Sequence, residues 1–439
     1  MNGVEITGEI KISLSRFAEI QRKVKNISEF KKEIGASLTQ KVTQLLELIL
    51  GGALILEASD LHIEPEEAEV KIRVRIDGIL QDVIVIDPKT YEALLSRIKL
   101  LSGLKLNITD RPQDGRFSIF IPAVKKEEEL AIEIRSSSLP AENGEAIVLR
   151  ILNPKSLMEM EALGLRNDLS EVFKKEIKKP NGMIIVTGPT GSGKTTTLYA
   201  FLKKIQRPEI KIITIEDPIE YHLKGISQTQ VQPSKGYDFA TGLRSIMRQD
   251  PDVILVGEVR DLETAEIALQ AALTGHFVLT TLHTNDAAGT IARLISLGAR
   301  PSDIGPAVNL TIAQRLVRKV CKKCGELTKI SAKDLQKIKK ELLGVAKTIK
   351  VPGLVPGLKI PQIKGCKECN FTGYKGRVGI FEAFMVDDEM EKFILTSPSI
   401  AALKSEAIKK GMVSMKQDGL IKVLDGITAI EEVERVAGE

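Results

Sequence analysis

Apolar and polar residues alternate regularly within one segment of the first third of the chain. Between residues 70 and 76, valine and isoleucine alternate with lysine and arginine, which is the two-residue period of a half-buried β-strand. An Asp-Gly pair follows at 77–78 and residues 79–86 are apolar again, as in a β-hairpin. Together with the neighbouring patterns this predicts a small α+β domain. Its other elements are strands over 116–121, 130–135 and 146–152 and helices over 37–50 and 91–101.

Beyond residue 180 the pattern changes to short apolar runs that are separated by segments with helical periodicity. Strands that alternate with helices are typical of a mainly parallel sheet, so we predict an α/β domain here. The predicted strands are 183–187, 210–215, 253–256 and 276–282.

The remaining segments are less regular. A polar, partly helical stretch precedes residue 180, and a stretch rich in Lys, Pro and Gly follows Cys321. A chain of 439 residues is long enough for several domains. The predicted division is an N-terminal arm (1–36), the α+β domain (37–155), a linker (156–179), the α/β core (180–320), a cysteine-bearing module (321–375) and a helical C-terminal region (376–439).

Composition excludes several classes of protein. Hydrophobic residues make up 43% and charged residues 28% of the chain, which is typical of a globular protein. The net charge of +5 is small for this length, so we expect no nucleic acid partner. No apolar run reaches the length of about 18 residues that a membrane-spanning helix needs, and the N-terminus lacks a signal-peptide pattern. We therefore expect a cytoplasmic protein.

The strongest chemical signal is the sequence GPTGSGKT at 188–195, which matches the phosphate-binding pattern GxxxxGK[ST]. It follows an apolar strand and opens a helix near Thr195, which is the context that the pattern requires. In such a loop, backbone N–H groups surround the phosphates, Lys194 reaches the β- and γ-phosphates, and the Thr195 hydroxyl binds Mg²⁺. The predicted ATP-binding residues are Gly188, Pro189, Thr190, Gly191, Ser192, Gly193, Lys194, Thr195 and Thr196.

Acidic residues follow two of the predicted strands. Glu258 follows the strand 253–256, and Glu216 follows the strand 210–215. Because ligands of α/β folds bind at the carboxyl ends of the strands, we predict that Glu258 holds Mg²⁺ or its water. Glu216 is predicted to orient or activate the attacking water. The alternatives are a helix-capping carboxylate at Glu258 and ordinary turn chemistry at Asp217-Pro218.

Two histidines flank the strand 277–282. His276 precedes it and His283 follows it, so they lie at opposite ends and are not expected to share a metal. A histidine near the γ-phosphate can sense the nucleotide by hydrogen bonding, and both are candidates for this contact. The alternative for each is a packed histidine with satisfied hydrogen bonds.

All four cysteines lie in two CxxC pairs, Cys321 with Cys324 and Cys366 with Cys369. This spacing suits a tetrahedral zinc site with four thiolate ligands. Such a metal would hold together the ends of the long loop between the pairs, which is a structural role. Redox-active CxxC pairs are the alternative, but neither pair lies at a strand-to-helix turn.

Several motifs in this order resemble those of the type II secretion and type IV pilus motor ATPases. The phosphate loop matches the family's Walker A motif, and three further segments match its Asp box, Walker B and His box. The likeness extends over roughly residues 37–430. The segments are ITIEDPIEY (213–221), DPDVILVGEVRD (250–261) and TGHFVLTTLHT (274–284), together with SDLHIEP (59–65), RVRIDG (73–78) and RPQDGR (111–116) in the first domain.

The resemblance implies a PAS-like α+β domain followed by a RecA-like P-loop ATPase domain, with a Cys₄ module and a helical C-terminal region. It also implies that Arg116, Arg135 and Arg150 of the first domain reach the phosphates bound on the second. Arginines that merely occupy the solvent face of a strand are the alternative.

The implied function is an ATP-hydrolysing homo-hexameric motor that uses ATP, Mg²⁺ and Zn²⁺. Its implied partner is an inner-membrane platform protein, through which it associates peripherally with the membrane. The cysteine module is similar to that of assembly and secretion motors, and the short segment before the first domain suggests a secretion-type or minimal pilus motor. Two other functions stay open: a RecA-like DNA motor, disfavoured by 4% aromatic residues and no tryptophan, and a nucleotide-gated scaffold, disfavoured by the presence of both Glu216 and Glu258.

Overall fold

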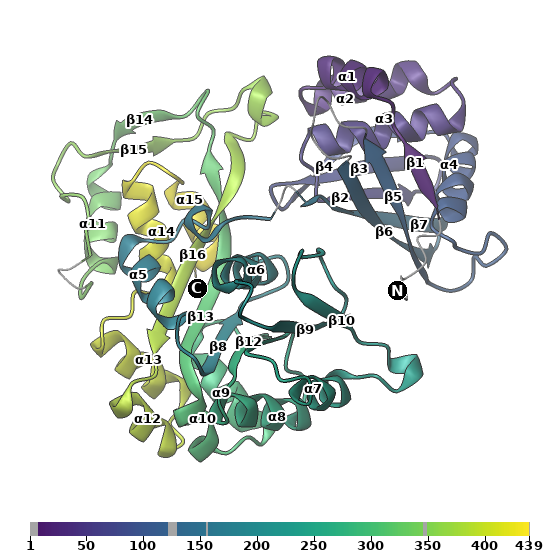
Figure 1. Cartoon of the computed structure of the whole chain (residues 1–439). Helices are drawn as coiled ribbons and strands as arrows, with labels where there is room; N and C mark the ends of the chain where they lie inside the picture. Colours follow the sequence, from purple (N-terminus) through teal and green to yellow (C-terminus); the bar gives the residue numbers. More distant parts are fainter. Residues whose placement is uncertain (1–7, 122–129, 155–156, 346–348, 439) are drawn as a thin grey trace. The chain divides into compact units, whose positions relative to one another are not determined.

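The computed structural model describes residues 8–121, 130–154, 157–345 and 349–438, and these form two compact units (Figure 1). Unit 1 comprises residues 1–156 and 364–375, and unit 2 comprises residues 157–363 and 376–439. No helix in the described ranges combines the length and the apolarity that crossing a membrane requires.

Unit 1 is built on a seven-stranded sheet in which β1 pairs parallel with β5 and the other neighbours are antiparallel. The hairpin between β3 and β4 turns at Asp77 and Gly78, which both have positive φ (51° and 83°), as the tight turns of two-residue hairpins require. In sheet order the strands are β1 (Glu9–Lys11), β5 (Gln113–Ile121), β6 (Leu130–Ala141), β7 (Gly144–Leu152), β2 (Asp60–Pro65), β3 (Val70–Ile76) and β4 (Ile79–Ile86).

Four helices pack with this sheet around one hydrophobic core. They are α1 (Leu14–Lys23), α2 (Ile27–Ser37), α3 (Val42–Ile55) and α4 (Pro88–Leu101). The sequence pattern did not predict the first two, because their apolar stripes are short and interrupted by charged residues. Phe30 and Ile34 of α2 are nevertheless fully buried. Residues 8–36 therefore belong to the core of unit 1, where an arm was expected.

Two adjacent glycines in α3 explain how these helices approach each other. A Cβ atom at Gly52 would lie 2.2 Å from the ring of Phe30, and one at Gly51 would lie 2.9 Å from Ile20. The glycines cost helix propensity, but they allow close contact with α1 and α2.

Unit 2 is built on a second seven-stranded sheet, with parallel pairing from β10 through β13. Every residue of the interior strand β8 is buried. Met183 and Ile185 enter one hydrophobic cluster and Ile184 and Val186 enter another, so β8 has a core on each face. In sheet order the strands are β10 (Ser227–Gln230), β9 (Ile212–Glu216), β11 (Val253–Val256), β12 (Phe277–Leu282), β8 (Gly182–Thr187), β13 (Val308–Val320) and β16 (Tyr374–Met385).

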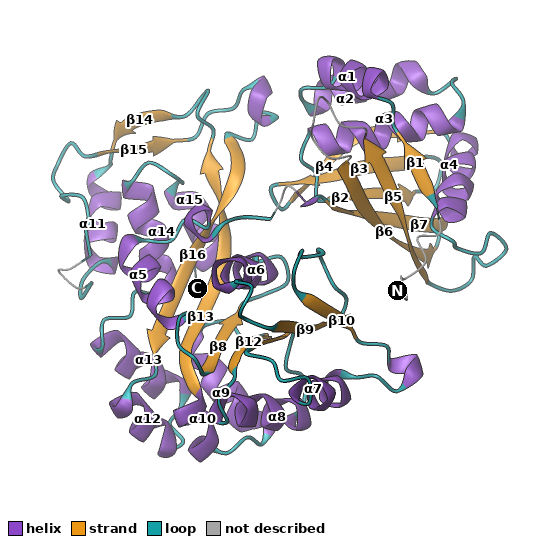
Figure 2. Cartoon of the chain, viewed as in Figure 1, coloured by secondary structure: helices purple, strands orange, loops and turns teal. Residues whose placement is uncertain are grey.

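The helices of unit 2 connect and flank these strands (Figure 2). They are α5 (Asn167–Glu176), α6 (Lys194–Ile205), α7 (Phe239–Met247), α8 (Leu262–Leu273), α9 (Ala287–Leu297), α10 (Pro301–Ala307), α11 (Ala332–Glu341), α12 (Asp388–Leu395), α13 (Ile400–Lys409), α14 (Met415–Leu424) and α15 (Ile430–Ala437). A small antiparallel sheet is formed by β14 (Glu326–Lys329) and β15 (Lys359–Gln362), and short 3₁₀ turns occur at η2 (Met160–Ala162), η3 (Pro233–Lys235) and η4 (Lys367–Cys369).

Three strands of the unit 2 sheet were not predicted, namely β10, β13 and β16. The segment of β10, SQTQ, contains no apolar residue. The pattern of β13 was missed because Asn309, Gln314 and Arg315 interrupt its apolar positions. The pattern of β16 was missed because glycines and charged residues dilute its alternation. The C-terminal region expected to be helical from residue 376 therefore begins inside a strand of the main sheet.

A buried carboxylate anchors the C-terminal helix to this sheet. Glu432 of α15 is 1% exposed and accepts hydrogen bonds from the backbone N–H of Arg318 on β13 (3.0 Å) and from the guanidinium groups of Arg318 (2.6 Å) and Arg435 (2.8 and 2.6 Å). Burial disfavours the ionised form, but these hydrogen bonds outweigh it and lower the pKa of Glu432 to about 2.

We expect Glu432→Gln to lower the free energy of unfolding by about 3 kcal/mol at neutral pH, because it removes the buried charge that Arg318 and Arg435 pair with. Since the folded-state pKa is depressed, this stabilisation is present above pH 4.5 and is lost as the pH falls toward 2. Chemical denaturation at pH 7 and pH 3 measures both effects. Glu434→Gln on the same helix is the control, because Glu434 is 41% exposed. Equal stability of the two variants would contradict the prediction.

Candidate functional site

The phosphate loop connects the end of β8 to the start of α6, as the sequence predicted. Gly188, Gly191 and Gly193 have φ of 143°, 78° and 88°, which residues with a Cβ atom rarely adopt. A Cβ atom at Gly188 would also lie 2.4 Å from the carbonyl oxygen of Gln314. The backbone conformation therefore favours glycine at these three positions, and at Gly188 the close approach of Gln314 does so as well.

The other predicted loop residues surround the first turn of α6. Pro189 and Thr190 are exposed, whereas Thr195 and Thr196 are half-buried on the helix. Ser192 is buried, and among the described residues its hydroxyl has no hydrogen-bond partner. A helix N-terminus behind a loop of glycines offers backbone donors and partial positive charge, so the residues fit a bound phosphate group.

Lys194 lies across this loop. Its ammonium group donates to the carbonyl oxygens of Gly188 (2.8 Å) and Pro189 (3.2 Å). Burial lowers the pKa of Lys194, and the negative charge of Glu258 acts in the opposite direction. Lys194 and Glu258 are thus close enough to interact electrostatically.

Glu258 follows β11 and lies among charged side chains at the carboxyl ends of the strands. One carboxylate oxygen accepts a hydrogen bond from Arg260, and the other lies 3.5 Å from Nε2 of His283. Arg260 also lies 3.5 Å from the carboxylate of Asp217. Glu258 and His283 of this group were singled out from the sequence as site residues, whereas Asp217 was considered only as part of a turn and the pairing of Arg260 with Glu258 was not predicted.

His276 does not belong to this group. It precedes β12, at the opposite end of the strand from the phosphate loop, and its Nδ1 lies 3.1 Å from the carbonyl oxygen of Ala271. Of these two histidines, only His283 lies at the carboxyl ends of the strands, where the phosphate loop also lies. Its contact with a nucleotide stays a prediction.

Glu216 has a different environment from Glu258. It is 3% exposed and accepts hydrogen bonds from Thr214 (2.6 Å), Gln228 (3.1 Å) and the hydroxyl of Tyr199. Burial raises the pKa of Glu216, although these hydrogen bonds oppose the shift. Its carboxylate is thus held between α6 and β10, and its predicted role toward water stays a prediction.

One residue that packs against the phosphate loop was not identified by any sequence motif. Gln314 of β13 is 2% exposed, and its side-chain oxygen accepts a hydrogen bond from Thr197 on α6 (2.7 Å). A Cβ atom at Gly193 would lie 2.8 Å from the side-chain amide nitrogen of Gln314. The available signal was a glutamine directly after the apolar run 310–313.

The three predicted phosphate-contacting arginines lie in unit 1. Arg116 pairs with Arg135 across β5 and β6, and Arg135 pairs with Arg150 across β6 and β7. Paired residues of antiparallel strands point to the same face, so the three guanidinium groups share one face of the sheet.

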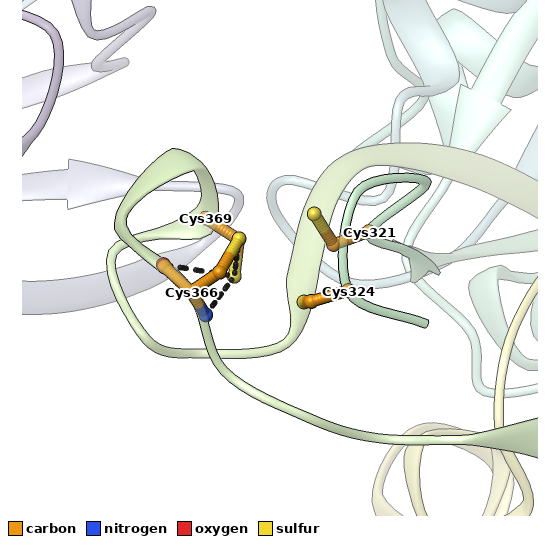
Figure 3. Close-up of side chains that lie close together, drawn as sticks. All are labelled: Cys321, Cys324, Cys366 and Cys369. Carbon is orange, nitrogen blue, oxygen red and sulfur yellow. Dashed lines mark hydrogen bonds between the residues drawn. The ribbon is translucent and has the colours of Figure 1, made fainter. Parts of the chain in front are cut away.

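The four cysteines lie together, as the CxxC spacing predicted (Figure 3). Their sulfur atoms are within 4.8 Å of one another, and Sγ of Cys366 lies 3.7 Å from Sγ of Cys369. Four thiolates bound to one zinc ion at about 2.3 Å would lie about 3.8 Å apart. The group therefore fits a tetrahedral zinc ion.

Comparisons with known proteins agree with these features. A family model described as type II/IV secretion system protein matches residues 36–435. The type IV pilus assembly ATPase PilB of Thermus thermophilus is 42% identical over 402 residues, which cover 91% of this chain and 43% of that protein. The type II secretion system ATPase E of Vibrio cholerae is 42% identical over 399 residues, covering 91% of this chain and 76% of that protein.

Among solved structures, the pilus retraction motor PilT with bound ADP matches with a TM-score of 0.57 and 27% identity. The match covers 88% of this chain and 95% of that one. The mixed α/β fold observed here is therefore the fold of a known group of ATPases.

Proposed function

This chain belongs to the type II/IV secretion system protein family, and from that premise we propose that it is the ATP-hydrolysing motor of a type II secretion or type IV pilus assembly system. Hydrolysis of ATP is the activity that the family and its ATPase members imply. The chain spans less than half of the Thermus relative and about three quarters of the Vibrio relative.

One observation carries the proposal: the phosphate loop with Lys194 and the acidic residue Glu258 lie at the carboxyl ends of the parallel strands β8 and β11, which flank β12 in the same sheet. In the proposed site, the N–H groups of residues 188–195 bind the phosphates and Lys194 binds the terminal ones. The hydroxyl of Thr195 and the carboxylate of Glu258 would hold Mg²⁺, which supplies charge neutralisation when it is bound.

The proposed steps then use the side chains near Glu258. Lys194 releases the carbonyl oxygens of Gly188 and Pro189 and donates to the phosphates. His283, 3.5 Å from Glu258, would contact the γ-phosphate in this proposal. Glu216 is the second acidic candidate for orienting the attacking water, and it would have to leave its hydrogen bonds with Thr214 and Tyr199 to do so.

We propose that the arginines of unit 1 complete the site when the two units close over the nucleotide. A change between ATP and its products would then move one unit relative to the other. A ring of six subunits is the proposed assembly, because a closed ring satisfies head-to-tail interfaces without forming fibres. The ring would act at the cytoplasmic face of the inner membrane on a platform protein, and the zinc ion would hold the cysteine module in shape.

Turnover in the presence of the proposed partner tests this function. We expect the purified chain to assemble into hexamers with a non-hydrolysable ATP analogue, because the nucleotide closes the interface that the ring repeats. We also expect the cytoplasmic part of a platform protein to raise ATP turnover several-fold. Light scattering after size exclusion and a phosphate-release assay measure the two outcomes. A protein that stays monomeric, and whose ATP turnover is unchanged by the platform protein, would overturn the ring-motor proposal.

A further inference from the structure

A row of charged residues crosses five strands of the unit 1 sheet, and it extends beyond the three predicted arginines. The register joins Arg150 of β7 to Asp60 of β2, and Asp60 to Arg75 of β3. The complete row is Arg116, Arg135, Arg150, Asp60 and Arg75. Since paired residues point to one face, a single carboxylate lies among four guanidinium groups.

Asp60 binds the arginine on each side of it. Its Oδ1 accepts a hydrogen bond from Nε of Arg150 (3.1 Å), and its Oδ2 lies 3.4 Å from Nε of Arg75. The hydroxyl of Ser59 also donates to Oδ2 (2.9 Å). Both oxygens of the carboxylate are therefore used to hold neighbouring side chains.

The burial of these groups differs in a way that matters for ligand binding. The Asp60 side chain is 8% exposed, whereas the Arg150 side chain is 54% exposed. Among the described residues, Asp60 is the hydrogen-bond partner of Arg150, and it uses only Nε. The terminal nitrogens of Arg150 thus keep their donors available for phosphate oxygens, which guanidinium groups bind in a two-pronged geometry.

A long arginine side chain loses conformational freedom when it binds a ligand. A buried acid that fixes Nε beforehand reduces this loss and sets the direction of the terminal nitrogens. The same acid offsets repulsion between Arg150 and Arg75, whose charges lie on either side of it in the row.

We propose that Asp60 is a positioning residue for ATP hydrolysis, which orients Arg150, and with it Arg75, toward the phosphates of the bound nucleotide. The inference rests on the proposed function, because it requires the arginine row to face a triphosphate. It adds Arg75 to the arginines proposed to face the phosphates. It also gives a role to the SDLHIEP motif at 59–65, to which the resemblance assigned no role.

A double-mutant cycle in the full chain tests this role. We expect Arg150→Ala to lower kcat about 100-fold and Asp60→Asn to lower it about 10-fold with little change in KM, because a displaced guanidinium loses transition-state contacts. Asp60→Asn combined with Arg150→Ala should be slower than Arg150→Ala alone by much less than 10-fold, because the acid acts mainly through Arg150 and only the remainder of its effect passes through Arg75. The kcat of Arg75→Ala should lie between that of the parent and that of Arg150→Ala.

Glu64→Gln is the matched control. Glu64 lies on the same strand and pairs with Arg73 (3.1 Å) outside the row, so its loss should leave turnover unchanged. If Asp60→Asn fails to fold in thermal melts, Asp60→Glu keeps the charge but displaces the oxygens, and it should also lower kcat.

The outcomes separate the inference from the proposed function. Independent, multiplying effects of Asp60→Asn and Arg150→Ala would overturn the positioning role, and so would full activity of a folded Asp60→Asn variant beside an inactive Arg150→Ala variant. Full activity of Arg150→Ala would instead remove the arginine contact from the proposed function, and the positioning role with it.

Discussion

Lys194→Ala is expected to lower ATP turnover by about 10²- to 10³-fold, which is the largest effect that any single substitution in this chain should have on activity. The ammonium group lies within hydrogen-bond distance of two carbonyl oxygens of the phosphate loop, which is the loop proposed to bind the terminal phosphates. Alanine removes the only charge on this side chain and leaves the loop backbone intact. A phosphate-release assay under saturating ATP measures the loss.

Lys203→Ala provides the control for this experiment. Lys203 lies on the same helix, but its ammonium group faces Glu159 at 3.3 Å and not the loop. We expect this variant to retain the parent turnover. If Lys194→Ala turned over ATP as fast as the parent, the chain would be a nucleotide-gated scaffold and the hydrolase proposal would fail.

Cys369→Ser should cause the largest loss of metal and of stability. Cys369 is 3% exposed, and its sulfur lies 3.3 Å from the backbone nitrogens of Cys366 and Gly373, where such N–H groups stabilise a thiolate. We expect about one zinc ion per chain in the parent and almost none in the variant, together with a Tm lower by several degrees, because metal binding contributes folding free energy.

Elemental analysis and thermal unfolding with and without a chelator measure these changes. Lys323→Ser introduces the same residue between the cysteines of the other pair, at an exposed position, and should keep both the metal and the Tm. A parent protein that contains no zinc after mild purification, with a Tm insensitive to chelators, would contradict the metal site and favour redox-active pairs.

The elements that the sequence predicted well are those in which buried and exposed residues follow a regular pattern along the chain. The strands β3 and β11 were predicted with their observed bounds, because β3 has one buried face and β11 is buried on both. The phosphate loop was predicted because its glycines, lysine and threonine are needed at a fixed local spacing. In each case, neighbouring residues along the chain contain the whole signal.

What the sequence did not predict depends on contacts between distant segments. The glycines of α3 appeared to interrupt an apolar helix, but they are required by Ile20 and Phe30, which pack on them. Gln314 belongs to no local motif, because its contact with Thr197 exists only once β13 lies beside β8. The proximity of Glu216 to Tyr199 and Gln228 likewise follows from the sheet, and a residue at a strand end need not face the ligand.

The arginine row shows the same limit in unit 1. The resemblance implied Arg116, Arg135 and Arg150, but their alignment with Asp60 and Arg75 depends on the register of four strand pairs. Strand register is set by which face each residue must bury, and it cannot be obtained from spacing along the chain.

The position of β8 between two cores has a thermodynamic consequence. Its alternate side chains belong to both hydrophobic clusters, and the loop at its end is where a nucleotide would contribute binding free energy. A ligand that binds only the folded state stabilises every part of the protein that unfolds together with its binding site. In unit 2 these parts are the two hydrophobic clusters that share β8. Calorimetry should therefore record unit 2 as one melting transition that moves to higher temperature as the ATP concentration rises.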